Sequence, residues 1–350
     1  MAGMVPPQGG PRCYRAHLGG RRGWRSDRSA LERAGTTASR HRPRRCETGS
    51  DEQPATARAG TEYRGMRIID AHLHIWDTDR LDYVWLHDVP SLDRPMGFGE
   101  LRSERASGTA HVDGFVFVQA DCRPDQAIDE VDWVASVAAD GPVVGIVGFA
   151  PLEHGDAVSV HLDALVQHEL VVGVRRLLQS EPAGFSRSDA FVTGARALAS
   201  RSLVFDACVT AGQIDDVTAL ADAVPELRIV LDHLGKPDAA RTASLEAWQR
   251  SIAQLALRPN VVCKVSGLPT QLGDLHWDGG SIRPWLDAAL ESFGADRLLF
   301  GSDWPASSGH TSYDRWLDAV VEWSAPLSPD ERSALFADTA TRTYSLPPQG

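Results

Sequence analysis

Three side chains that could take part in catalysis, Asp70, His72 and His74, occur at every second position of one short stretch. The stretch starts with Ile68 and Ile69, which predict a buried β-strand, and side chains along a strand alternate between its two faces. All three side chains should therefore project to one face. Two imidazoles on one face, at the end of an apolar strand, form a pair of metal ligands or proton carriers. A pair of hydrogen-bonded structural histidines is the alternative.

Other polar side chains also lie at or near the ends of short apolar runs. They are Gln119, Arg175, Asp206, Cys208, Asp232, His233, Lys264, Ser266 and Asp303. Charged groups are costly to bury at such positions unless they meet one another, a metal or a substrate. Their convergence would mark a functional site, so the fold has to bring distant parts of the chain to one place.

From residue 66 onward, β-branched apolar runs alternate with segments whose apolar residues are spaced by three and four, as in repeated βα units. The eight predicted strands are 67–74, 114–120, 143–150, 171–178, 203–209, 228–234, 260–267 and 297–303. The predicted helices are 125–139, 156–168, 187–201, 213–224, 244–258, 282–293, 312–322 and 329–341. This order predicts an α/β fold, a single-domain (β/α)₈ barrel over residues 66–346, with its working face at the C-terminal ends of the strands.

Two details of the connections follow from the same pattern. Asp125 and Ser328 are predicted helix N-caps, because short oxygen-bearing side chains can accept hydrogen bonds from first-turn amides. The connection 77–113 contains no clear helical pattern and is too long for an ordinary βα loop. We therefore expect it to form a lid or a specificity segment.

Residues 1–65 differ from the rest of the 350-residue chain in composition. They hold thirteen arginines and no lysine against six acidic residues, with few aliphatic side chains and no apolar periodicity. Such a segment cannot bury enough surface to offset its ordering entropy, so we predict a disordered basic segment. A functional basic tail is one interpretation. The plainer one is that the natural protein starts at Met66 and the upstream segment is an extended reading frame.

The overall charge of −12 leaves about −19 on residues 66–350, once the surplus of about +7 in the basic segment is removed. An acidic body argues against nucleic acid as a partner. The sequence contains no run of about 18 apolar residues, which a predicted membrane span would require. The five cysteines are odd in number and widely spaced, which favours reduced thiols and a cytoplasmic location. The expected partner is a small-molecule substrate, and the sequence makes no prediction of oligomeric state.

Five blocks of this sequence resemble the amidohydrolase superfamily, in particular its amidohydrolase-2 branch. In chain order they are residues 70–77 (DAHLHIWD), 173–175 (GVR), 230–237 (VLDHLGKP), 263–267 (CKVSG) and 300–305 (FGSDWP). The similarity covers nearly all of residues 66–346. Within the branch, the blocks are most similar to sugar-lactone hydrolases of the fuconolactonase and rhamnonolactonase type.

The resemblance implies that His72, His74, His233 and Asp303 occupy the positions of the metal centre, and that Asp303 activates the attacking water. Binuclear members carry a carboxylated lysine where this chain has Arg175, and a histidine on the fifth strand where Asp206 and Cys208 stand. The resemblance therefore implies at most one divalent ion, such as Zn²⁺, and some lactonases of the branch work without metal. No organic cofactor is expected.

Lactone hydrolysis requires a base for the attacking water and positive charge or donors at the developing oxyanion. We expect Asp303 to be the base and His233 to be a third ligand or a proton carrier. Arg175 and Lys264 could bind a carbonyl oxygen or a carboxylate, although each could instead form a structural ion pair with Asp70 or Asp206.

The remaining candidates are neutral side chains near the working face. Gln119 is a candidate hydrogen-bonding partner of substrate hydroxyls. Trp76 and Trp304 could stack on a sugar ring or serve in packing alone. Asp232 is expected to face away from His233 and to be structural.

The leading hypothesis is a hydrolase of small cyclic esters, with a sugar lactone as the first candidate substrate. A zinc-dependent decarboxylase of a small carboxylic acid is the second hypothesis, because it can use a similar set of His and Asp residues. A non-catalytic barrel that binds small acids is the third.

Overall fold

The computed structural model describes Tyr63 and residues 65–108, 110–273 and 276–347. The chain divides into two units, Met1–Arg58 and Ala59–Gly350. The predicted basic segment 1–65 lies outside the described residues, apart from Tyr63 and Gly65. The description below concerns the second unit.

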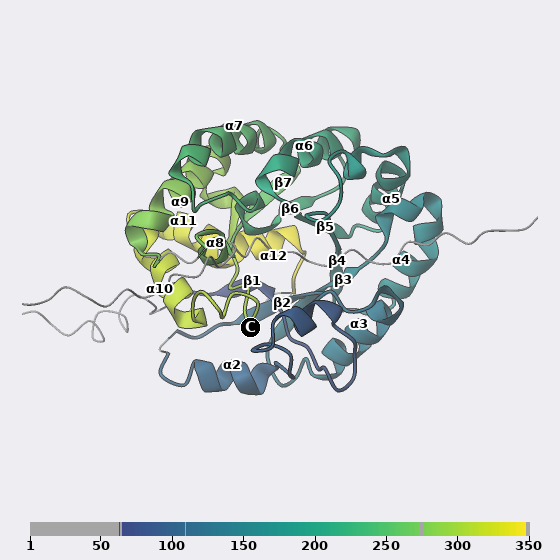
Figure 1. The fold of residues 1–350 in the computed structure, drawn as a ribbon, viewed down its shortest axis with the longest axis horizontal. Helices are drawn as coiled ribbons and strands as arrows, with labels where there is room; N and C mark the ends of the chain where they lie inside the picture. The colour runs from purple at the N-terminus through teal and green to yellow at the C-terminus, as the bar shows by residue number, and fades with distance from the viewer. Residues whose placement is uncertain (1–62, 64, 109, 274–275, 348–350) are drawn as a thin grey trace, which may run out of the picture. The chain divides into compact units, whose positions relative to one another are not determined.

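Eight parallel strands form one sheet in the order in which they occur along the chain (Figure 1). They are β1 (Ile69–Leu73), β2 (Gly114–Val118), β3 (Val143–Phe149), β4 (Val171–Leu177), β5 (Val204–Cys208), β6 (Ile229–Leu231), β7 (Val261–Val265) and β8 (Leu298–Phe300). Backbone hydrogen bonds join the first strand to the end of the last: Asp303 N donates to His72 O at 2.8 Å, and His74 N donates to Trp304 O at 2.8 Å. The predicted (β/α)₈ barrel is confirmed.

Helices follow the strands in sequence, and most of them surround the barrel. They are α2 (Phe98–Glu104), α3 (Ala127–Ser136), α4 (Ser159–Leu165), α5 (Asp189–Ala199), α6 (Ile214–Ala223), α7 (Leu245–Ala256), α8 (Leu268–Gln271), α9 (Gly279–Phe293), α10 (Tyr313–Trp323), α11 (Pro329–Ser333) and α12 (Thr339–Thr343). The Ser328 hydroxyl accepts from Glu331 N, as predicted for an N-cap. The N-cap prediction for Asp125 is wrong, because a 3₁₀ turn, Pro124–Gln126, precedes α3 and includes this residue.

Alternation along the strands divides the core into two layers. Val116, Val118, Val147, Val204, Val230 and Leu299 belong to an inner cluster, whereas Phe117, Ile146, Val174 and Phe205 belong to an outer cluster beneath the helices. The C-terminal residues Ala337, Ala340, Tyr344 and Leu346 complete the inner cluster. Figure 1 shows α12 within the ring of strands. Arg228, which directly precedes β6, donates to Thr343 O at 2.6 Å, so α12 closes the amino ends of the strands.

The connection 77–113 contains two short helices that its sequence did not predict, the 3₁₀ helix Val84–Asp88 and α2. Its interior packs around Trp76, whose indole N–H donates to Arg94 O at 2.9 Å. The Trp85 indole N–H donates to Ala120 O at 2.8 Å and ties the segment to the end of β2. The connection is therefore folded onto the rim of the barrel.

Within the described part of the chain, no helix combines the length and the apolar character needed to cross a bilayer.

Candidate active site

The paired imidazoles lie at the end of β1, inside the barrel. His72 Nε2 and His74 Nε2 are 3.2 Å apart, and both residues are at most 5% exposed. His74 Nδ1 lies 2.7 Å from Val118 O. Because a carbonyl only accepts hydrogen bonds, Nδ1 must carry the proton and Nε2 of a neutral His74 presents its lone pair to the site.

Asp70 does not share the face of the two imidazoles, so this part of the prediction is wrong. The pairing of β1 with β2 shifts register between Asp70 and Leu73. Before the shift, Ile69 and Ala71 belong to the inner cluster, whereas Leu73 after it belongs to the outer cluster. A strand irregularity of this kind reverses the alternation. The Asp70 carboxylate instead accepts from His72 N at 3.0 Å and Ser302 N at 2.9 Å.

Asp303 and His233 enter the site from residues that follow β8 and β6. Asp303 Oδ1 lies 3.8 Å from His72 Nε2, 3.6 Å from His74 Nε2 and 3.9 Å from His233 Nε2. Both residues adopt left-handed backbone conformations, with φ of 59° at Asp303 and 53° at His233. Non-glycine residues are sparse in this region, and such strain is found preferentially at functional sites.

Two glycines make room for these groups. A Cβ atom on Gly267 would lie 2.6 Å from His233 Nδ1, and Gly267 has a φ of +61°. A Cβ atom on Gly301 would lie 2.7 Å from the Cβ of His72. The site therefore depends on close backbone approach at both positions.

The electrostatics favour neutral imidazoles around a carboxylate. Burial holds the pKa of His72 and of His233 well below the usual range, and burial also lowers the pKa of His74. Burial alone would raise the pKa of Asp303, but His233 and His74 outweigh it and the pKa is lowered. A neutral imidazole and an ionised carboxylate are the forms that bind a metal ion.

The donor set fits one divalent cation. His72, His74 and Asp303 each present a ligand atom, and these atoms lie within 4.8 Å of one another. Two nitrogen ligands of one tetrahedral Zn²⁺ would lie about 3.3 Å apart, which matches the spacing of the two Nε2 atoms. His72, Asp232 and His233 form a second group of this kind.

Asp232 faces into the barrel, contrary to the expectation that it points away from His233. Strand β6 ends at Leu231, and the chain then enters a 3₁₀ turn in which His233 is left-handed. Alternation therefore stops before His233, and both side chains reach the site. Asp232 Oδ1 lies 3.3 Å from His72 Nδ1 and 3.0 Å from Lys264 Nζ.

Lys264 lies beneath His72 and is fully buried. Its Nζ is 2.5 Å from Asp206 Oδ2 and 3.1 Å from His72 Nδ1. Burial alone would lower the pKa of Lys264, but the carboxylates of Asp206 and Asp232 outweigh it and the pKa is raised. These contacts favour the ion-pair interpretation of Lys264 over direct contact with a substrate.

Arg175 and Gln119 line the same region. Arg175 Nη1 lies 3.4 Å from His72 Nε2 and 3.9 Å from Asp232 Oδ2, and its Nη2 donates to Gln119 O. The Gln119 side-chain oxygen accepts from Asp121 N at 2.5 Å, whereas its Nε2 has no hydrogen-bond partner among the described residues. A buried amide donor without a partner is suited to a substrate oxygen.

The two tryptophans predicted to contact substrate are each 1% exposed. Trp76 is held inside the connection 77–113, and the Trp304 indole N–H donates to Glu104 of α2 at 2.8 Å. Both side chains therefore serve in packing in this conformation, which was the alternative interpretation.

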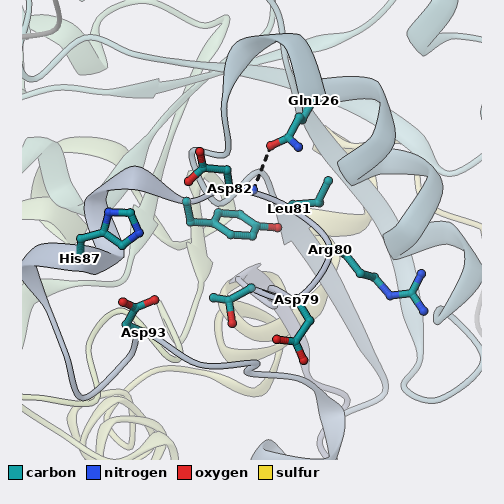
Figure 2. A pocket seen from close by; sticks show the side chains of 9 residues that line it. Asp79, Arg80, Leu81, Asp82, His87, Asp93 and Gln126 are labelled. Atoms are coloured by element: carbon teal, nitrogen blue, oxygen red, sulfur yellow. Dashed lines mark hydrogen bonds between the residues drawn. The ribbon is translucent and has the colours of Figure 1, made fainter.

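A pocket of about 300 Å³ lies in the connection 77–113 (Figure 2). Its lining residues are Thr78, Asp79, Arg80, Leu81, Asp82, Tyr83, His87, Asp93 and Gln126. Gln126 Oε1 accepts from Asp82 N at 2.9 Å and holds one side of it. None of the predicted site residues lines this pocket, so it is separate from the imidazole site.

Sequence reasoning did not assign a functional role to Ser266 or Lys236. The Ser266 hydroxyl lies 2.9 Å from His233 Nδ1, and Lys236 Nζ donates to Gln179 Oε1. Ser266 lies two residues after Lys264 on the same inward face, so the period of the strand could have indicated its position. Lys236 has a left-handed backbone with φ of 47°, which no periodicity predicts.

A carboxylate among three imidazoles lies at the C-terminal ends of the strands, where enzymes of the (β/α)₈ class carry their active sites. Residues 69–346 match the model of the Amidohydrolase family, and the chain belongs to that family. The predicted resemblance is thereby confirmed, and the protein is a hydrolase.

Two known proteins place the chain within this family, and a third shares its fold. It is 34% identical over 286 residues to an L-fucono-1,5-lactonase of Burkholderia ambifaria, covering 79% of this chain and 95% of the relative. An amidohydrolase from Burkholderia multivorans with bound Zn is 32% identical, with a TM-score of 0.72 over 80% of this chain and all of the other. A 2,6-dihydroxybenzoate decarboxylase from Rhizobium is 16% identical, with a TM-score of 0.54 over 80% of this chain and 99% of the other, and shares the fold alone.

Proposed function

We propose that this protein hydrolyses a small sugar lactone, with Asp303 as the base that activates water. One observation carries the proposal: the Asp303 carboxylate faces three imidazoles within 4 Å, in a chain similar to an L-fucono-1,5-lactonase. The lowered pKa of Asp303 supports this role because the carboxylate is in its proton-accepting form at neutral pH.

The residues divide the reaction between them. Asp303 takes a proton from the water that attacks the lactone carbonyl. Arg175 and the Nε2 amide of Gln119 are the donors nearest to where the oxyanion develops and where the sugar hydroxyls would lie. The ring C–O bond then breaks, and the proton held by Asp303 passes to the ring oxygen, either directly or through His233. The product is a hydroxy acid, and its carboxyl group then loses a proton to solvent.

A divalent ion would be held by His72, His74 and Asp303, with His233 as a further ligand. When bound, it would polarise the carbonyl or the water. The Zn named for the Burkholderia multivorans relative supports this assignment. We expect elemental analysis of the purified protein to find about one Zn²⁺ per chain, and chelation to lower activity at least 10-fold, with recovery when Zn²⁺ is restored. Unchanged activity in protein shown to be free of metal would assign the reaction to the side chains alone.

The substrate class is tested with the full chain and a panel of five- and six-membered aldonolactones that includes L-fucono-1,5-lactone. Release of acid is followed with a pH indicator, and Asp303→Asn serves as the inactive reference. We expect turnover of at least one lactone above the spontaneous rate. Folded protein that hydrolyses none of them would overturn the proposal. Release of CO₂ from an aromatic carboxylate would favour the decarboxylase hypothesis instead, and ligand-induced thermal stabilisation without turnover would favour the binding barrel.

A further inference from the structure

The residues that follow β2 are held in place by side chains from three other segments. Gln119 O accepts from Arg175 Nη2 of β4. Ala120 N donates to Glu130 Oε1 of α3 at 3.0 Å, and Ala120 O accepts from the Trp85 indole of the connection 77–113 at 2.8 Å. Polar groups carried by this strand end are therefore in position before a ligand arrives, which lowers the cost of binding.

One side-chain donor at this strand end has no partner in the described part of the protein. Gln119 is 1% exposed, and its Oε1 accepts from Asp121 N at 2.5 Å. Because a backbone N–H only donates, the amide oxygen must face Asp121, and the amide nitrogen is directed away from it. This Nε2 atom has no hydrogen-bond partner. A buried donor of this kind is costly unless a ligand supplies the acceptor.

Asp121, two residues further on, carries an acceptor at the same place. Its backbone is left-handed, with φ of 61°, a conformation that favours Asp and Asn and occurs preferentially at functional sites. Among the described residues, its carboxylate has no hydrogen bond or ion pair. Burial raises the pKa of Asp121, and the charges of Arg175, Arg176 and His74 oppose this effect. Two of these three groups belong to the imidazole site, so the carboxylate lies within electrostatic reach of it.

The donor and the acceptor together match one functional group. An ionised carboxylate only accepts hydrogen bonds, whereas the amide nitrogen of Gln119 only donates. A carbonyl oxygen would satisfy Gln119 but would offer Asp121 no donor. A hydroxyl group both accepts and donates, so it satisfies both residues. A lactone whose carbonyl oxygen lies against Arg175 would bring the hydroxyl on the neighbouring carbon to this pair, because Arg175 is bonded to Gln119 O.

We propose that Gln119 and Asp121 form a hydroxyl-binding subsite for the substrate. Gln119 Nε2 donates to the oxygen of the hydroxyl next to the lactone carbonyl, and the Asp121 carboxylate accepts the hydrogen bond from the same O–H group. Asp121 determines specificity and is not a base, since no bond of this hydroxyl changes during hydrolysis. The inference rests on the proposed function and narrows the substrate to lactones that carry a hydroxyl on the carbon beside the carbonyl.

The test compares a lactone that wild type hydrolyses with the analogue that lacks only this hydroxyl. A site built to bind a hydroxyl rejects such an analogue, so wild type should prefer the hydroxylated lactone by about 100-fold in kcat/KM. Asp121→Asn keeps the side-chain shape and suits a left-handed backbone, so the variant should fold. It should raise KM for the hydroxylated lactone about 10-fold, keep kcat within about threefold and reduce the preference to about 10-fold.

Asp125→Asn is the matched control, because this exposed acid is close in sequence and pairs with Arg123. It should retain the wild-type constants for both lactones. An undiminished preference in Asp121→Asn, or no preference in wild type, would overturn the subsite and leave lactone hydrolysis intact. An equal loss of kcat on both lactones would overturn the specificity role and place Asp121 in the chemical step. A wild-type protein that hydrolyses no lactone would overturn the proposed function, and the subsite with it.

Discussion

Asp303 faces all three imidazoles of the site, since its Oδ1 lies within 4 Å of one nitrogen of each. Asp303 has a left-handed backbone, with φ of 59°, three residues beyond the end of β8. An amide at this position would keep the shape of the side chain but lose the proton acceptor.

We therefore expect Asp303→Asn to lower kcat by a factor of about 10² to 10⁴ while KM changes little. Steady-state kinetics on a lactone identified from the panel measure both constants, and circular dichroism checks the fold. Asp125→Asn is the control, because Asp125 is an exposed acid whose partner is Arg123. A decrease below threefold for Asp303→Asn would show that another group takes the proton.

For individual residues, the sequence predicted which side chains come together, but it did not predict correctly which side of the strand each one faces. The structure brings His72, His74, His233 and Asp303 together, and their roles stay predictions. The errors at Asp70 and Asp232 share one cause: strict alternation was carried through a register shift in β1 and past the end of β6. Both departures depend on local backbone geometry that a two-residue period does not encode.

Among the elements, the turn at Gly267 between β7 and α8 packs directly against the site. Gly267 has a left-handed φ, and an added methyl group would collide with His233 and lie 3.1 Å from Asp303 Oδ2. Gly273 has a similar φ of +66°, but a Cβ atom there would meet nothing within 4 Å. Comparing substitutions at the two glycines therefore separates the effect of backbone strain from the effect of displacing His233 and Asp303.

Gly267→Ala and Gly273→Ala should each lower the free energy of unfolding by about 1 kcal/mol, because both place a side chain in the left-handed region. Only Gly267→Ala should lower kcat, by about 100-fold, since its methyl group displaces the imidazole and the carboxylate. Denaturant unfolding and kinetics on the same preparations measure the two effects. Equal activity in the two variants would contradict the steric argument.

The elements missed by the sequence are short ones. Helix α2 has seven residues and starts after Gly97, whose backbone N–H is capped by Glu100, so it presents little periodicity to detect. The predicted helix 329–341 is divided by a π-helical turn, Ala334–Asp338. This turn and α12 pack into the inner cluster, and tertiary packing of this kind overrides a continuous helical pattern.

For the whole molecule, the alternation of strands and helices sufficed to predict the barrel, because parallel strands joined by helices have few other closed arrangements. The stability of the folded chain also depends on a buried acid that is not among the proposed catalytic residues. Glu130 is fully buried on α3 and accepts from Ala120 N at 3.0 Å. Burial raises the pKa of Glu130 from 4.5 to about 7, against the opposing effect of that amide.

This shift makes stability depend on pH with a defined sign. Between about pH 4.5 and 7 the folded state holds a proton that the unfolded state has lost, so stability falls as pH rises through this range. Glu130→Gln removes the cost of burying a charged carboxylate. The variant should therefore be more stable than wild type at pH 8, by an amount on the order of 3 kcal/mol or roughly 5 °C in Tm. The difference should vanish near pH 4.5.

Thermal unfolding of both proteins from pH 4.5 to 8 measures this difference. Asp129→Asn, an exposed acid of the same helix, is the control and should retain the pH dependence of wild type. A Glu130→Gln variant that is less stable than wild type at pH 8 would mean that the carboxylate is needed in its charged form.

The packing of α12 against the amino ends of the strands also has a consequence for biosynthesis. A ribosome makes β1 and its two histidines early, yet the hydroxyl that orients Asp206 belongs to Tyr344 and emerges after all eight strands. A nascent chain can thus assemble most of its barrel while the ammonium under His72 still lacks its final support. Competence for chemistry would then depend on residues that are made only after the last strand.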